Sequence, residues 1–310
     1  MPSLKAIRTR IASVKNTQKI TKAMKLVAAA RLRRAQDQML AARPYSSRLA
    51  DMVHDLLGKM VLDPGEAAHP LLEPRKIERV RLIVVSSDRG LAGGYNSNLN
   101  RRTERFLVEE APKYPHIELA VVGRKSREHF RRRKANIVRE YAGVTSETAH
   151  ERAQEIGKEA VADFLDKKVD AVFVVYNEFK SAISQIVQVK QLLPLAASQH
   201  VAEGEGSAAP RSGGSGTLSG SRSLIDFEYE PSRGEVLSTL VPLYLETMLL
   251  QVMLEAIASE LGARMSAMDS ATKNAKEMIA AYTLQFNRAR QAAITKELVE
   301  IVSGAEALKG

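Results

Sequence analysis

The residues of this sequence that could carry chemistry are two Gly-Lys pairs, one His-Glu pair and a glycine-rich turn. A phosphate-binding loop needs Ser or Thr directly after Gly-Lys, where the hydroxyl meets the Mg²⁺ ion. Gly58 and Gly157 each precede a lysine, but Met60 and Glu159 follow those lysines. The Gly-Lys pairs therefore predict no nucleotide site, and the dinucleotide pattern G-x-G-x-x-G does not occur in the chain.

The His-Glu pair and the turn are also incomplete as sites. His150-Glu151 begins the zinc-protease pattern H-E-x-x-H, but Gln154 stands where the second histidine should be. The turn from Asp88 to Gly94 (DRGLAGG) could cradle an anion with its backbone N–H groups. A tight turn at a strand end has the same composition, and we favour it because no binding motif surrounds the glycines. We predict no catalytic residue, no metal site, no cofactor and no enzyme activity.

Composition and charge exclude several further classes. The chain contains no cysteine, so disulfides, thiol switches and thiolate metal sites are excluded. Net charge is +10, and residues 1–48 hold 12 Lys or Arg against one acidic residue, so the basic character belongs to one arm. No apolar run of membrane-spanning length and no secretory signal is predicted. The basic arm resembles a mitochondrial presequence, but its apolar register continues for about 40 residues, which disfavours that interpretation.

The element around which the chain is organised is the stretch from Leu243 to Ser303, which has no proline and one glycine, Gly262. About 60 helical residues span roughly 90 Å. A compact domain made from the whole chain would be only about 50 Å across. The helix must therefore project from its own protein, and it needs a partner along its length.

Small and apolar residues in this stretch follow the alternating four-and-three spacing of a coiled-coil seam. A 3.5-residue repeat implies a left-handed supercoil. The predicted seam consists of Ala256, Ser259, Ala263, Ser266, Ser270, Ile294, Leu298, Ile301, Ala305 and Leu308.

The N-terminal stretch, residues 3–43, has no glycine or proline and predicts the mate of that helix. Its heptad positions are apolar at both ends, and Gln18, Thr21 and Lys25 occupy them in the middle. Because both helices leave the same body, we predict an antiparallel pair. The apolar heptad positions are Leu4, Ile7, Ile11, Val14, Ala28, Leu32, Ala35, Met39 and Ala42, whereas Ile20, Met24 and Val27 lie beside the polar ones.

One face of this N-terminal helix is basic, with Arg8, Lys15, Lys19 and Lys22 at helical spacings. Nucleic-acid binding is one interpretation, but no aromatic residue precedes Tyr45, so bases would find no stacking platform. A solvated charged face is the second interpretation. The third, which we favour, is a basic rod inside an acidic protein sleeve, where long-range attraction acts without tight pairing.

The middle of the chain has a different sequence pattern, with short runs of apolar, β-branched residues at 80–87, 119–123 and 170–177. Helical segments near 98–111, 124–134 and 146–167 separate them, which predicts a Rossmann-like α/β body with a largely parallel sheet. Residues 181–192 predict a further, antiparallel strand. The predicted domains are an N-terminal coiled-coil helix at 1–60, the α/β body at 75–230 and a C-terminal coiled-coil helix at 240–310. Within the body, the Gly/Ser-rich segment 203–223 predicts a flexible insertion and 224–229 a short returning strand.

Two long terminal helices around an inserted α/β body form an unusual plan, and four blocks of sequence resemble one family. The blocks are IASVKNTQKITKAMKLVAA (11–29), SSDRGLAGGYNSNL (86–99), SELGARMSAMDSATKNA (259–275) and ARQAAITKELVEIVSGAEAL (289–308). In these blocks, in order and at the expected separations, the chain resembles the gamma subunit of F-type ATP synthases.

The resemblance implies a rotor that binds no nucleotide itself. Its coiled coil would turn inside a ring of alpha and beta subunits, with the body against the epsilon subunit and the membrane c ring. The complex would be peripheral on the cytoplasmic face of a bacterial plasma membrane, with no nucleic acid and no direct ligand. The positions that match beta-subunit contacts are Met24, Lys25, Arg264, Met265, Arg290, Gln291 and Thr295, and those that match the foot near the c ring are Phe227 and Tyr229.

Two other classes stay open from the residues alone. One is a soluble α/β enzyme that its long helices dimerise, and the other is a basic coiled-coil nucleic-acid binder. Co-purification distinguishes them, because the rotor would arrive with alpha, beta and epsilon subunits, the enzyme as a dimer and the binder with nucleic acid.

Overall fold

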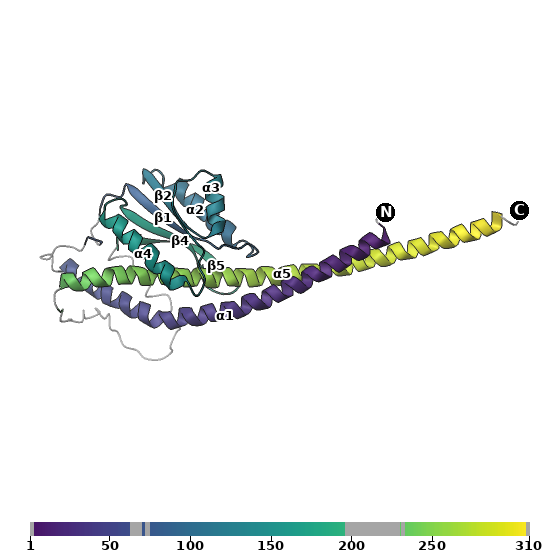
Figure 1. The fold of residues 1–310 in the computed structure, drawn as a ribbon, viewed down its shortest axis with the longest axis horizontal. Coiled ribbons are helices and arrows are strands. Elements are labelled where there is room, and N and C mark those ends of the chain that lie inside the picture. The colour runs from purple at the N-terminus through teal and green to yellow at the C-terminus, as the bar shows by residue number, and fades with distance from the viewer. Residues whose placement is uncertain (1–2, 63–69, 72–74, 196–229, 231–232, 308–310) are drawn as a thin grey trace, which may run out of the picture.

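A computed structural model describes residues 3–62, 70–71, 75–195, 230 and 233–307. Two long helices, α1 (Leu4–Leu62) and α5 (Arg233–Ala307), run antiparallel and form a shaft (Figure 1). An α/β body, inserted between them in the sequence, lies beside one end of this shaft. The predicted plan of a helical pair with an inserted body is therefore confirmed.

Both shaft helices run through a proline. Pro44 lies inside α1, and Pro242 lies inside α5, which begins at Arg233, seven residues before the C-terminal helix predicted at 240–310. A proline removes one backbone hydrogen bond and opposes helix formation. The flanking turns continue because they bury large side chains, such as Leu49 on α1 and Val241 and Leu245 on α5.

The body contains a five-stranded sheet with the order β3-β2-β1-β4-β5. The first four strands are parallel, and β5 pairs antiparallel with β4, as predicted. This order is the one expected of a Rossmann-like body. The strands are β1 (Arg79–Val85), β2 (His116–Val122), β3 (Ile137–Tyr141), β4 (Ala171–Phe179) and β5 (Gln185–Leu193).

Helices cover both faces of the sheet, and the alternation of side chains along β1 explains why. Leu82 and Val84 face the core formed with α2 (Tyr95–Glu110) and α3 (Arg124–Arg132). Ile83 and Val85 face the larger core formed with α4 (Ala149–Leu165), α5 and α1. A strand that is buried on both sides has a continuous run of apolar residues, and residues 82–85 (LIVV) form such a run.

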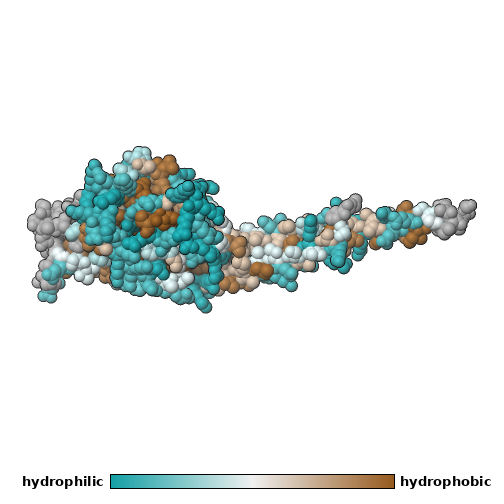
Figure 2. Space-filling view, turned by 45° about the horizontal axis from the view of Figure 1, so that its top comes forward, coloured by the Kyte–Doolittle hydropathy of each residue, from teal (hydrophilic) through white to brown (hydrophobic). Residues whose placement is uncertain are grey.

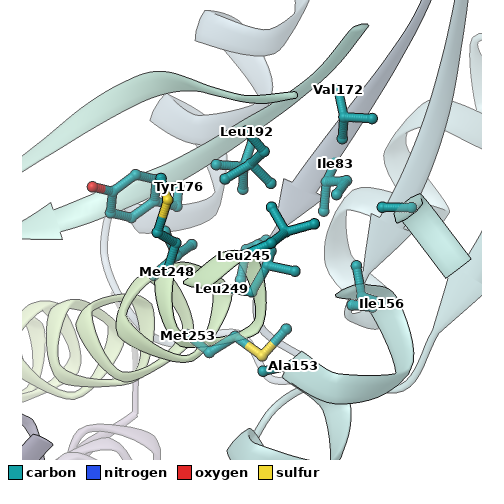
Figure 3. Close-up of a cluster of buried hydrophobic side chains, with 14 of the residues drawn as sticks. Ile83, Ala153, Ile156, Val172, Tyr176, Leu192, Leu245, Met248, Leu249 and Met253 are labelled. Carbon is teal, nitrogen blue, oxygen red and sulfur yellow. The ribbon is translucent and has the colours of Figure 1, made fainter. Parts of the chain in front are cut away.

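The shaft is part of the body's core, because α5 packs against the sheet. Leu245, Leu249 and Met253 point toward Ile83 and Ile156 in a dense apolar cluster (Figure 3). Leu245, Leu249 and Met253 have no exposed surface. Full burial of each such side chain contributes about 1.5–3 kcal/mol. The body and the shaft therefore fold as one structure, and the base of α5 cannot turn independently of the sheet.

Three elements of the body, namely the glycine-rich turn after β1, the start of α2 and strand β4, hold α5 where it leaves the body. The glycine-rich turn after β1 contacts α5, because Arg264 donates a hydrogen bond to the Gly90 carbonyl at 3.2 Å. Tyr95 donates to the Ala256 carbonyl at 3.1 Å, and Ser259 donates to the Asn177 carbonyl at 2.8 Å. The turn predicted from its glycines is thus a docking element for the shaft.

Strand β3 was not predicted. Its sequence, IVREY, is short and carries two charged residues, and Arg139 and Glu140 are exposed. It forms the edge of the sheet, where only one neighbour is needed. The predicted insertion at 203–223 and the predicted strand at 224–229 lie outside the described residues.

Candidate functional site

The candidate functional site is the outer surface of the shaft beyond the body, so its geometry depends on which residues the two helices bury between them. On α1 the buried or half-buried positions are those of the predicted heptads, including Thr21 and Lys25. On α5 the corresponding positions form one unbroken four-and-three series. That series is Leu261, Met265, Met268, Thr272, Ala275, Ile279, Tyr282, Phe286, Ala289 and Ala293.

The seam predicted for the C-terminal helix was therefore wrong in both of its parts. Ala256 and Ser259 are buried against the body, because Tyr95 and Asn177 contact them, and Ser270 is exposed. At the far end Ile294, Leu298 and Ile301 are 48%, 57% and 68% exposed. A long helix carries several four-and-three patterns at once, and only the helix beside it decides which one is buried.

The end of α5 projects beyond α1. The Arg8 guanidinium lies 5.7 Å from the centre of the Phe286 ring, and α1 begins at Leu4. Both helices rise 1.5 Å per residue, so Leu4, four residues before Arg8, lies opposite about residue 290 of α5. Roughly 15 further residues of α5, spanning about 25 Å, extend past α1, which agrees with Figure 1.

This projecting end is amphipathic and carries exposed apolar side chains. Figure 2 shows hydrophobic residues along the thin end of the molecule. Within the described chain no other element covers this segment (Figure 1). Burial of such side chains is favourable by about 25 cal/mol per Å² of apolar surface. An exposed group of them therefore indicates a surface that binds a partner. The exposed residues are Ile294, Leu298, Val299, Ile301 and Val302.

The three polar residues predicted near this end point away from α1. Arg290, Gln291 and Thr295 are exposed, whereas Ala289 and Ala293 on the same turns are half-buried toward α1. The Thr295 hydroxyl donates to the Gln291 carbonyl at 3.0 Å, and no ion pair involves Arg290 among the described residues. These side chains are free to bind a partner.

The exposed side of α1 combines apolar and basic residues. Ile20, Leu26 and Val27 are 60%, 63% and 53% exposed, and Met24 is half-buried at the edge of the seam. The predicted basic residues Arg8, Lys15, Lys19 and Lys22 are exposed as well. A surface with this mixture suits an enclosing partner that is partly apolar and partly acidic.

Lys25, predicted as a beta-subunit contact, has its ammonium group engaged within the chain. It donates to Asp269 on α5 at 2.6 Å, and Lys273 lies 2.9 Å from the other Asp269 oxygen. Hydrogen bonds from Lys25 and Lys273 lower the pKa of Asp269, so its carboxylate is ionised at neutral pH. The Lys25 side chain is still 40% exposed, so a partner can approach it.

Arg264 and Met265 also lie inside the molecule rather than on its partner-facing side. The Arg264 side chain is 13% exposed, pairs with Glu260 and donates to Gly90. Burial raises the pKa of Glu260, and Arg264 opposes that rise. Met265 is half-buried in the seam with α1. Phe227 and Tyr229, predicted for the foot, lie outside the described residues.

Among the described residues, those that line one cavity of the body form no catalytic arrangement. A cavity of about 520 Å³ lies at the carboxyl ends of the strands, and its lining includes Asp88, Arg89, Arg124 and Arg127. No nucleophile with a neighbouring base lines it. No group of His, Asp and Glu able to hold a metal occurs among the described residues. One stretch of α5, Gly234–Gly304, is long and apolar enough to cross a membrane, but 56% of its most apolar window is buried, as in a core helix.

Comparison with known proteins decides the family. The sequence model of the family described as "ATP synthase" matches residues 3–308. The "ATP synthase gamma chain" of Anaeromyxobacter sp. (strain Fw109-5) is 51% identical over 309 residues, covering all of both chains. This chain belongs to the ATP synthase gamma chain family. The predicted resemblance is confirmed over the full length, including both shaft helices and the body.

Two solved structures share the fold of this gamma chain family member at low identity. The rotor of the Euglena gracilis mitochondrial ATP synthase aligns with a TM-score of 0.62 at 17% identity, covering 94% of this chain and 98% of that one. The central stalk and c-ring structure from Tetrahymena thermophila aligns with a TM-score of 0.58 at 22% identity, covering 81% and 99%. The two helices and the body thus have the architecture of an ATP synthase central stalk.

Proposed function

We propose that this chain is the central rotor of an F-type ATP synthase and couples rotation of a membrane c ring to the catalytic sites of surrounding beta subunits. In this proposal the projecting end of α5 and the upper part of α1 turn inside a ring of alpha and beta subunits. The body and the base of the shaft meet the c ring and an epsilon subunit. The chain performs no chemistry of its own, and the complex lies on the cytoplasmic face of the bacterial plasma membrane.

The observation that carries this proposal is the exposed end of the shaft. About 25 Å of helix with five exposed large apolar residues extends past α1, while its base is fixed in the core of the body. A rigid connection from body to tip transmits torque, and an asymmetric tip presents different side chains to each subunit of a ring as it turns. Met24, Arg290, Gln291 and Thr295 are the partner contacts that we propose on this surface.

The alternatives from the sequence have less support. A dimerised enzyme would need a free coiled-coil seam, but α1 and α5 of the same chain bury their seam against each other. A nucleic-acid binder would need stacking side chains beside its basic residues, and the described surface of α1 above the body has none.

The direct test is reconstitution of the complex. Co-expressed with the alpha, beta and epsilon subunits of its own source, the chain should co-purify with them as a stoichiometric complex with ATPase activity. Omission of the chain should abolish coupled proton pumping. Calorimetric titration of MgATP into the isolated chain should show no site of micromolar affinity, because no phosphate-binding loop is present. A micromolar site on the isolated chain, or failure to co-purify, would contradict the proposal.

Arg290 and Gln291 give a sharper test of the partner surface. Exposed helix residues changed to alanine usually shift stability by under about 0.5 kcal/mol. An arginine that hydrogen-bonds to an enclosing ring contributes about 1.5–3 kcal/mol at some rotor angles. We therefore expect Arg290→Ala and Gln291→Ala to leave thermal melting of the isolated chain unchanged, while steady-state ATPase of the assembled complex falls several-fold.

The matched control is Arg132→Ala, which removes an exposed arginine from body helix α3. It should change neither melting nor ATPase. ATPase at the wild-type rate in both shaft variants, measured at equal complex concentration, would show that Arg290 and Gln291 face only water.

A further inference from the structure

Between the body and the tip, the seam of the shaft is polar rather than apolar. Thr21 is 8% exposed, and its hydroxyl lies 2.8 Å from that of Thr272. One turn along, Lys25 pairs with Asp269 at 2.6 Å. We call these four residues, Thr21, Lys25, Asp269 and Thr272, the polar layer. Both pairs link α1 to α5 directly, across more than 240 residues of sequence.

The seam above the polar layer cannot by itself choose one alignment of the helices. Ile7, Ile11 and Val14 on α1 meet a series that includes Ile279 and Phe286 on α5. Apolar seam residues of similar size pack almost equally well after a shift of one heptad, so they lose little stability. Coiled coils therefore use a polar seam residue to specify register. The polar layer provides such a residue on each helix.

A shift of one heptad would break the polar layer in either direction. In one direction Lys25 would stand opposite Lys276, and the two like charges would repel. In the other direction it would stand opposite Gly262, which has no side chain and packs against the Ala182 backbone. In both cases Asp269 would lose Lys25 and keep only Lys273, which lies on its own helix. The observed alignment is therefore the one in which these charges and hydroxyls are satisfied.

The position of α5 along its own axis is fixed relative to the body, because α5 forms hydrogen bonds with Tyr95, Asn177 and Gly90. The helix α1 packs mainly on α5, so its upper half has no comparable anchor on the body. We propose that the polar layer fixes the axial register of α1 on α5, and that its four members are positioning residues for the shaft. A slip of one heptad would move α1 by about 10 Å along α5 and change how much of α5 projects.

The absence of cysteine in the chain makes this testable with introduced cysteines. Positions 7 and 14 on α1 and 279 and 286 on α5 give four pairs. Ile7 with Phe286 and Val14 with Ile279 are in register, as the Arg8–Phe286 contact indicates. The crossed pairs, 7 with 279 and 14 with 286, are one heptad out of register. A disulfide needs Cα atoms within about 7 Å, so the crossed pairs close only after a slip.

In the full chain with an intact polar layer, we expect both in-register cysteine pairs to form disulfides under mild oxidation. The crossed pairs should form disulfides at least about tenfold more slowly, which corresponds to a slip that costs about 1.4 kcal/mol or more. In a layer-free variant, the crossed pairs should close about as fast as the in-register pairs. That variant combines Thr21→Val, Lys25→Leu, Asp269→Leu and Thr272→Val.

A charge-swapped variant keeps the test informative if the layer-free chain folds poorly. Lys25→Asp combined with Asp269→Lys should retain the wild-type preference, whereas Asp269→Lys alone should lose it. The matched control, Lys22→Leu with Asn274→Leu, changes two exposed residues close to the polar layer and should leave the preference intact. Crossed pairs that stay tenfold slower in both the layer-free and the Asp269→Lys chains would overturn the proposal.

Discussion

Replacement of Arg81 by alanine is expected to lower the free energy of unfolding by about 3–5 kcal/mol. The buried Asp163 carboxylate would then keep only Lys168, at 3.3 Å, and Arg139, at 3.9 Å, whose side chains are 61% and 48% exposed. Arg81 lies on β1 with 8% of its side chain exposed. It pairs with Asp163 on α4, whose side chain is 7% exposed, and with Glu118 on β2 at 2.6 Å. The guanidinium thus joins two strands to the helix that covers them.

The comparison that isolates the uncompensated charge is a double variant. Arg81→Met with Asp163→Leu removes both buried charges and retains most of the packed volume, so it should cost less than Arg81→Ala alone. Arg105→Ala, on the exposed side of α2, is the surface control and should stay within about 0.5 kcal/mol of the parent. Urea unfolding followed by circular dichroism measures all three. Equal losses in the single and double variants would show that packing, and not charge, is responsible.

The same pair gives the body a pH dependence. Burial alone would raise the pKa of Asp163, but hydrogen bonds and charge from Arg81 outweigh it and hold that pKa below the ordinary aspartate range. A carboxyl with a depressed pKa in the folded state contributes stability above its unfolded pKa, near 3.9. That contribution is lost as pH falls through the lower folded value. Acid should therefore destabilise the parent chain more steeply than the double variant.

The sequence was sufficient for the large features of the fold because they have strong local signals. Heptads on α1 and β-branched runs in the body depend only on which side chains are apolar. The seam of α5 could not be predicted in this way, because small residues such as Ala256 and Ser259 fit either a neighbouring helix or the body. Only the three-dimensional arrangement shows that helix α2 and strand β4 of the body contact them.

The exposure of a predicted contact residue follows from the sequence where its side chain has no alternative within the chain. Arg290 and Gln291 are exposed because small alanines on the same turns already fill the seam. Lys25 and Arg264 were harder, because their acidic partners, Asp269 and Glu260, lie on α5 and could equally have faced solvent. For Lys25 the sequence did contain a signal, because this residue occupies a heptad position. A residue at a heptad position is expected to contact the other helix of the shaft rather than an outside partner.

Gly123 is the position in the body where the smallest change should have a large effect. It ends β2 and begins α3 with φ of 89°, a conformation that side chains rarely adopt. A Cβ atom there would lie 2.4 Å from the Ser86 carbonyl oxygen. That backbone cannot easily move, because Ser86 N–H donates to the Val122 carbonyl at 2.9 Å and Ser86 Oγ accepts from Ser126 N–H at 3.1 Å.

We therefore expect Gly123→Ala to lower the free energy of unfolding by about 2–5 kcal/mol, which combines left-handed strain of about 1–2 kcal/mol with overpacking of about 1–3 kcal/mol. Gly90→Ala is the matched control in the neighbouring turn. A Cβ at Gly90 would meet only the flexible end of Lys125, at 3.8 Å, so this change should stay within about 0.5 kcal/mol. Urea unfolding of the body measures both variants. A loss of under about 1 kcal/mol for Gly123→Ala would mean that the β1 and β2 ends can separate, and that the docking turn is not rigidly held to the sheet.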